Sequence, residues 1–218
     1  MKDEITLVKK FHEMIAQKKE RENQPYWLKG VHSHVNLASK GFRCIWSSWW
    51  KGETPPKLEV DMIFVFEDIK KAIDSALIIG TEIKFFRDIS KRNFYEGLQQ
   101  VMAFAVFGFD GLALWHLFPE EVNDKLIENY AQATQEIING FDLPMFYLAA
   151  KVTGQFKFKC FAPAQISQYD LDALVSWTGN SCSEKRNPLL FAEVPLGPGS
   201  GEIKKRRNTL KVMLKIPA

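Results

Sequence analysis

Three β-rich runs lie close together in the first half of the chain and constrain its fold more than any other feature. Residues 42–50, 58–66 and 76–86 are dominated by Ile, Val, Phe and Trp, and turn-forming or polar segments separate them. Runs of this composition are typical of β-strands. We therefore expect three consecutive strands of a meander in this region.

After residue 92 the pattern alternates between helix and strand. Residues 93–107 indicate a largely buried helix, because apolar side chains surround its second half, and residues 112–118 indicate a strand. Pro119 suits the first position of a helix that runs to about residue 138, and residues 145–152 complete the pattern as a fifth strand. A meander followed by a β-α-β crossover predicts an α/β fold, in which helices flank a mixed central sheet.

The two ends of the chain differ in character. Apolar residues recur every three or four positions over residues 3–22, which predicts an amphipathic helix, and a shorter helix is expected over residues 26–39. Residues 153–218 alternate polar and apolar side chains and carry a Pro/Gly-rich segment. We expect a core domain of residues 1–152 and a β-rich C-terminal extension of residues 153–218. The extension has no autonomous core, so we expect it to serve as a sheet addition, a homodimer interface or a ligand-gripping appendage.

The composition favours a soluble, intracellular protein. Three widely spaced cysteines among 218 residues form neither a disulfide framework nor a CxxC metal cage, so a reducing, cytoplasmic location is expected. No apolar run approaches the ~18–20 residues that a membrane span requires, and no membrane partner is expected. The net charge of +3 neither requires nor excludes a nucleic-acid partner.

Three ionisable residues interrupt two of the predicted strands. Asp61 lies inside one apolar run, and Glu82 and Lys84 lie two positions apart in the next, where their side chains share one face. An isolated ionised carboxylate is costly in such surroundings, so these groups must be paired, bind a metal or face a cleft. Two converging carboxylates suit Mg²⁺ or Mn²⁺, and a nearby lysine can orient a water or stabilise charge on a phosphate. The alternative is a structural ion-pair network at the sheet edge.

The order of these residues resembles a known family. Asp61, then Glu82-Ile83-Lys84 on the next strand, then a helix carrying Gln100, is similar to the PD-(D/E)XK nuclease superfamily with its restriction-endonuclease-like fold. Residues 100–104 (QVMAF) resemble the Q-x-x-x-Y helix motif of RecB-type and archaeal Holliday-junction-resolvase-like nucleases, with Phe in place of Tyr. The resemblance covers roughly residues 40–150.

The resemblance implies a role for each of these residues. Asp61 and Glu82 would bind Mg²⁺ or Mn²⁺, with the Ile83 carbonyl as a further ligand. Lys84 would act on the attacking water or on the scissile phosphate of DNA. Gln100 would support this site or touch the nucleic acid.

The family often adds an acidic residue from its first helix, and the sequence leaves this residue open. By helical angle Glu4 lies at the centre of the apolar stripe, Glu13 points away from it and Glu22 lies at the helix end. His32 or His34 is the alternative, reaching the site from the second expected helix.

A basic run near the C-terminus adds a second feature. Residues 197–218 contain six basic residues and one acidic residue, and four of the basic ones are consecutive: Lys204, Lys205, Arg206 and Arg207. Such a patch is the charge pattern expected of a contact with a phosphate backbone, although a solvated basic edge is the alternative. The sequence therefore predicts a metal-dependent deoxyribonuclease. The alternative is a non-catalytic nucleic-acid-binding or assembly protein that retains the nuclease fold.

Overall fold

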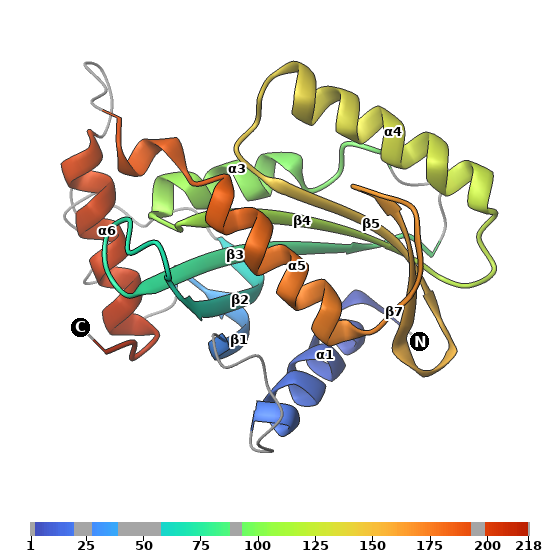
Figure 1. The fold of residues 1–218 in the computed structure, drawn as a ribbon, viewed down its shortest axis with the longest axis horizontal. Coiled ribbons are helices and arrows are strands. Elements are labelled where there is room, and N and C mark those ends of the chain that lie inside the picture. The colour runs from blue at the N-terminus through green and yellow to red at the C-terminus, as the bar shows by residue number, and fades with distance from the viewer. Residues whose placement is uncertain (1–2, 20–27, 39–57, 88–92, 193–198, 218) are drawn as a thin grey trace.

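A seven-stranded sheet forms the centre of the described part of the protein (Figure 1). The computed structural model describes residues 3–19, 28–38, 58–87, 93–192 and 199–217. The α-helices are α1 (Glu4–Lys19), α3 (Leu98–Phe107), α4 (Asp124–Gly140), α5 (Leu171–Glu184) and α6 (Ser200–Met213), and two short 3-10 helices are η2 (Gly154–Phe156) and η3 (Pro188–Leu190). The strands are β1 (Leu28–Asn36), β2 (Glu59–Glu67), β3 (Ala76–Phe85), β4 (Gly111–Phe118), β5 (Phe146–Thr153), β6 (Lys157–Ala162) and β7 (Ile166–Tyr169).

The strands lie in the sheet in the same order as in the chain. Strand β2 pairs antiparallel with β1 and β3, and β6 pairs antiparallel with β5 and β7. Strands β3, β4 and β5 are parallel, because α3 and α4 carry the chain back across the sheet between them. The protein is therefore α/β with a mixed, open sheet flanked by helices, which confirms the expected class.

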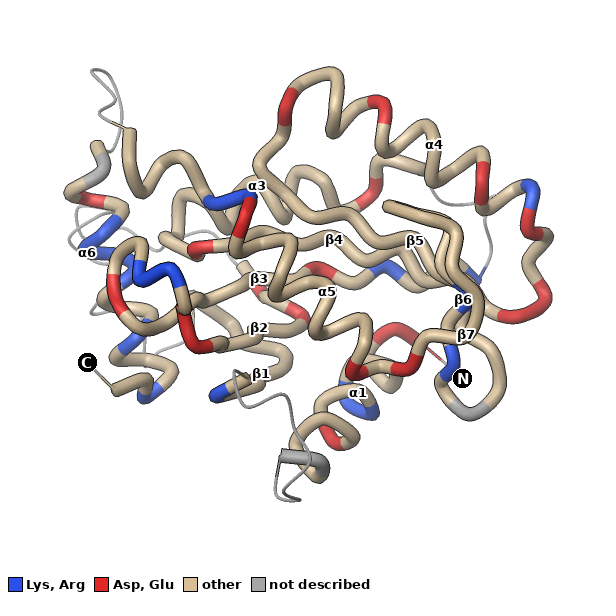
Figure 2. Tube along the Cα trace, in the orientation of Figure 1, with Lys and Arg blue, Asp and Glu red and all other residues tan. Residues whose placement is uncertain are grey.

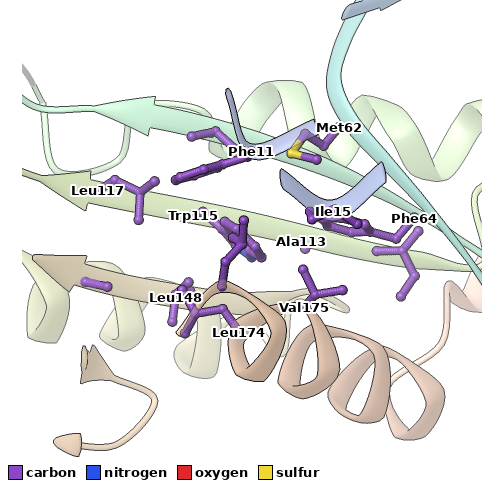
Figure 3. Close-up of a cluster of buried hydrophobic side chains, with 14 of the residues drawn as sticks. Phe11, Ile15, Met62, Phe64, Ala113, Trp115, Leu117, Leu148, Leu174 and Val175 are labelled. Atoms are coloured by element: carbon purple, nitrogen blue, oxygen red, sulfur yellow. The ribbon is translucent and has the colours of Figure 1, made fainter. Parts of the chain in front are cut away.

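Helices cover both faces of the sheet and enclose two apolar cores. Phe11 of α1 and Val175 of α5 pack on one face around Trp115 of β4 (Figure 3). The opposite face is covered by α3, α4 and α6, and Phe104 and Ile127 are among its buried residues. Burying side chains of this size contributes about 1.5–3 kcal/mol each, so these two layers hold the helices on the sheet.

Most of the element predictions for the first two thirds of the chain are confirmed. The strands expected at 58–66, 76–86, 112–118 and 145–152 are β2, β3, β4 and β5, each within one residue at either end. The helix expected over residues 93–107 begins only at Leu98, and the helix expected from Pro119 begins at Asp124. The later start of α4 follows from its cap, because the Asn123 side chain accepts a hydrogen bond from the Lys125 backbone N–H at 2.9 Å.

The predicted helix over residues 26–39 was wrong, because Leu28–Asn36 is strand β1. This segment pairs antiparallel with β2, and the ladder supplies backbone partners that helix periodicity does not anticipate. β1 thus takes the place of the first meander strand. The strand expected at residues 42–50 lies outside the described residues.

The prediction of a β-rich C-terminal extension was wrong beyond Tyr169. Strands β6 and β7 do extend the sheet, but α5 and α6 follow them. Asp170 caps α5 by accepting a hydrogen bond from the Ala173 backbone N–H at 2.9 Å, and Leu174 enters the same core as Phe11. Leu210 of α6 is buried in the other core. The extension therefore shares both cores with residues 1–152.

Candidate active site

The fold brings Asp61 and Glu82 to neighbouring positions on β2 and β3. The last residues paired between these strands are Met62 and Thr81, so Asp61 and Glu82 follow directly where the ladder ends. There the Ile83 backbone N–H donates to Asp61 Oδ2 at 2.8 Å. The Asp61 carboxylate is therefore fixed against β3 beside Glu82.

Glu82 and Lys84 form a buried ion pair that uses only one of the two carboxylate oxygens of Glu82. Lys84 Nζ lies 2.6 Å from Glu82 Oε1, and the side chain of Glu82 is only 2% exposed. Glu82 Oε2 is buried and has no hydrogen-bond partner among the described residues. Because nearly all buried polar atoms in proteins are paired, this oxygen calls for an explanation, and a bound water or cation is one.

Glu4 is the acidic residue of α1 that lies at Lys84. Glu4 lies in the first turn of α1, where its Oε2 accepts a hydrogen bond from the Phe85 backbone N–H at 3.1 Å. Its Oε1 lies 3.7 Å from Lys84 Nζ. Glu13 is exposed, and Glu22 lies outside the described residues. Three elements, α1, β2 and β3, thus each contribute a carboxylate to one cluster.

Of the two histidine alternatives, His34 lies nearer to the cluster. It is on β1, and its Nδ1 lies 3.2 Å from Glu59 Oε1. A positive charge on His34 contributes to lowering the pKa of Asp61, although burial has the larger and opposite effect. His32 lines a cavity between β1 and the C-terminal residues 214–217 instead.

The cluster is short of positive charge. Burial raises the pKa of Asp61 to about 6, and burial together with the charge of Asp61 raises the pKa of Glu82 to about 8. Burial alone would lower the pKa of Lys84, but the surrounding carboxylates outweigh it and raise that pKa. Lys84 therefore remains charged and faces three acidic groups, of which Glu82 keeps its proton at neutral pH. A bound cation would take the place of that proton.

The donor set fits a divalent cation that takes few ligands from the protein. No three His, Cys, Asp or Glu side chains in the described ranges converge as a preformed metal cage. Mg²⁺ typically uses one or two carboxylates and keeps water or substrate oxygens in its remaining positions. Asp61 and Glu82, with the unpartnered Glu82 Oε2, supply such a set of hard oxygen ligands.

The segment before α3 lies directly on Glu82 and Lys84. Gly97 has a φ of +87°, and a Cβ atom there would lie 3.3 Å from Lys84 Cγ and 3.4 Å from Glu82 Cγ. The same atom would lie 2.8 Å from Leu114 Cδ1, closer than real Cβ contacts allow. The sequence pattern does not single out this residue, because Gly97 falls inside the helix expected from residue 93. A glycine immediately before a strongly apolar run was the signal available.

Gln100 is not tied to the cluster. It lies half-buried on α3, and in the described structure no hydrogen bond links it to Asp61, Glu82 or Lys84. Its predicted supporting role stays a prediction.

The basic run lies at the other end of β3 (Figure 2). Lys204 and Lys205 are exposed on α6, whereas Arg206 and Arg207 are buried. Arg207 contacts the carbonyl oxygen of Ala76 at the start of β3, and the strand from Ala76 to Glu82 spans roughly 20 Å. Two of the four residues expected to contact DNA are therefore turned inward, and the other two are distant from the carboxylates.

Comparisons of the chain with known protein families, with curated proteins and with solved structures gave no match. Among the described helices, none is long and apolar enough to cross a membrane.

Proposed function

We propose that this protein is a metal-dependent nuclease of the PD-(D/E)XK type, which hydrolyses phosphodiester bonds in DNA. The observation that carries the proposal is the buried Glu82 carboxylate, which has one unpartnered oxygen and lies beside Asp61 and Lys84. The order of α1, the β1–β2–β3 meander, α3 and β4 agrees with the restriction-endonuclease-like core that the sequence resemblance implies.

Each residue of the cluster has a distinct part in this proposal. Asp61 and Glu82 would hold a Mg²⁺ or Mn²⁺ ion, which supplies a nucleophilic water at neutral pH and neutralises charge on the phosphate. Lys84 donates to Glu82 at 2.6 Å and has further N–H groups for a water or a phosphate oxygen. Glu4 holds the backbone of Phe85 and lies near Lys84, so it positions the end of β3.

The decisive experiment is cleavage of a panel of labelled linear, circular, single-stranded and branched DNAs with Mg²⁺ or Mn²⁺. We expect Glu82→Gln and Asp61→Asn to lose at least 100-fold in rate, as removal of preorganised electrostatic groups typically does. Glu202→Gln is the matched control, because Glu202 is an exposed residue of α6 and should leave cleavage unchanged. Cleavage by Glu82→Gln at the parental rate would refute the catalytic assignment.

Calorimetry with Mn²⁺ tests the metal centre without relying on turnover. The parent protein should release or absorb heat on binding Mn²⁺, and Glu82→Gln should not. DNA binding that is sensitive to salt, needs no metal and occurs without cleavage would instead favour a non-catalytic nucleic-acid-binding protein.

A further inference from the structure

The segment of residues 93–97 is fixed to the core through two of its carbonyl groups. Thr134 Oγ1 of α4 donates to the Phe94 carbonyl oxygen at 2.7 Å. His116 Nε2 of β4 lies 2.9 Å from the Glu96 carbonyl oxygen. The residue between these two anchored positions is Tyr95.

The anchor at Glu96 has a defined protonation state. The Tyr147 hydroxyl lies 3.0 Å from His116 Nδ1, and burial lowers the pKa of His116 to about 4. The imidazole is therefore neutral at physiological pH, and only its protonated nitrogen can donate to the carbonyl. Nε2 thus carries the proton, and Nδ1 accepts from the tyrosine. This buried chain holds the backbone that follows Tyr95, and Thr134 holds the backbone that precedes it.

The side chain of Tyr95 remains at the surface although its backbone is held. Tyr95 is 51% exposed, and the Phe94 ring supports it edge to face with the ring centroids 5.2 Å apart. Two residues span at most about 7 Å, so the Tyr95 backbone lies within that distance of Gly97. Gly97 in turn rests on Glu82 and Lys84. The segment therefore carries an exposed, supported aromatic ring on a short stretch of backbone that ends against Glu82 and Lys84.

We propose that Tyr95 stacks on an unpaired nucleobase of the substrate, one or two nucleotides from the scissile phosphate. This inference rests on the proposed nuclease function and assigns its substrate class, a DNA with single-stranded or frayed structure at the point of cleavage. Bases inside a duplex are stacked about 3.4 Å apart and cover one another's faces, so a free base face is offered chiefly where the DNA is single-stranded or frayed. The upper limit of about 7 Å between the Tyr95 and Gly97 backbones equals about two such steps, so the contacted base would lie close to the scissile phosphate.

The test compares binding of a single-stranded oligonucleotide with binding of the same sequence as a blunt duplex, by fluorescence anisotropy without added metal. Tyr95→Ala should weaken single-strand binding roughly 5- to 150-fold, since stacking on one base is worth a corresponding free energy. Duplex binding should not change. Tyr95→Phe, which keeps the ring, should bind as the parent does. Phe141→Ala is the matched control, because Phe141 is an aromatic residue that is 77% exposed at the end of α4.

The possible outcomes separate this inference from the proposed function. If the parent cleaves DNA and Tyr95→Ala binds single strands as tightly as the parent, the stacking role is wrong and the nuclease assignment stands. Equal weakening of single-strand and duplex binding by Tyr95→Ala also overturns it. If Tyr95→Ala weakens only single-strand binding while no DNA is cut, base stacking is supported and the catalytic assignment fails.

Discussion

Two buried ionic clusters lie toward opposite ends of β3 and differ in how their charges are compensated. The Glu82 cluster consists of Glu4, Asp61, Glu82 and Lys84. The Arg207 cluster consists of Asp74, Asp110, Arg207 and Lys211. The first has three acidic groups and one basic group, whereas the second has two of each.

In the Arg207 cluster the buried charges have specific partners. Arg207, only 1% exposed, donates to Asp110 at 2.7 Å, to both oxygens of Asp74 and to the carbonyl oxygen of Ala76 at 2.6 Å. The other oxygen of Asp110 accepts from the Ile78 backbone N–H at 2.8 Å. This network joins α6 to the start of β3 and to the residue before β4.

Burial by itself does not distinguish the two clusters. Burial raises the pKa of Asp110, as it raises that of Glu82. What differs is the number of partners, because both Asp110 oxygens are hydrogen-bonded and Glu82 Oε2 is not. A network that only stabilises the fold closes its hydrogen bonds within the protein, whereas an open one leaves a position for a ligand.

The largest expected effect on stability is at the Arg207 cluster. Arg207→Met should destabilise the protein by about 3–5 kcal/mol, because it leaves Asp110 as an uncompensated buried charge. Urea unfolding at pH 7 measures this. Lys205→Ala on the exposed side of the same helix is the control and should change stability by less than about 0.5 kcal/mol. A loss below about 1 kcal/mol for Arg207→Met would show that this cluster is not structural.

A second prediction concerns acid stability and Asp74. Burial alone would raise the pKa of Asp74, but hydrogen bonds from Arg207 and Lys211 outweigh it and hold the pKa well below its usual range. Stability from this group is therefore present above the ordinary pKa near 3.8 and is lost as the pH falls below it. Asp74→Asn should cost about 1.5–3 kcal/mol at pH 7. The stability of the Asp74→Asn variant should also fall less than that of the parent between pH 4 and pH 2, as chemical unfolding at several pH values would show. An equal loss in both proteins would contradict the prediction.

The stability contributed by the Glu82 cluster should show the opposite pH dependence. The pKa of Glu82 is raised in the folded protein, so stability falls as the pH rises from about 4.5 through about 8. Glu82→Gln cannot ionise, and in a chelating buffer at pH 9 it should be more stable than the parent by at least about 1 kcal/mol, because each unit of the pKa shift is worth about 1.4 kcal/mol. In a chain of this size that corresponds to a melting temperature at least about 2–4 °C higher.

Two controls sharpen this comparison. At pH 4 the advantage of Glu82→Gln should vanish, because the parent carboxyl is then protonated as well. Added Mn²⁺ should raise the melting temperature of the parent and not that of Glu82→Gln, since only binding to the folded state stabilises it. A variant that melts below the parent at pH 9 would mean that the Glu82–Lys84 pair stabilises the fold as a closed pair does.

The local pattern predicted much of the fold and three of the four residues of the Glu82 cluster. The alternation of side chains along β2 and β3 placed Asp61, Glu82 and Lys84 on adjacent strands, and the structure confirms those strands. The pattern failed for β1, where the pairing with β2 overrides a weak helical signal. It also failed for α5 and α6, whose apolar residues fill both cores and take helical form there.

The charged partner of each buried ionisable group was decided by contacts between distant parts of the chain. The sequence by itself determined that ionisable groups interrupt two apolar strands, because the period of a strand is a local property. Only the tertiary structure brought Glu4 to Lys84, paired Arg207 with Asp110, and left Glu82 Oε2 without a partner among the described residues. The physical reason is that a charge is compensated by whatever folds against it, and residue spacing carries no information about that neighbour.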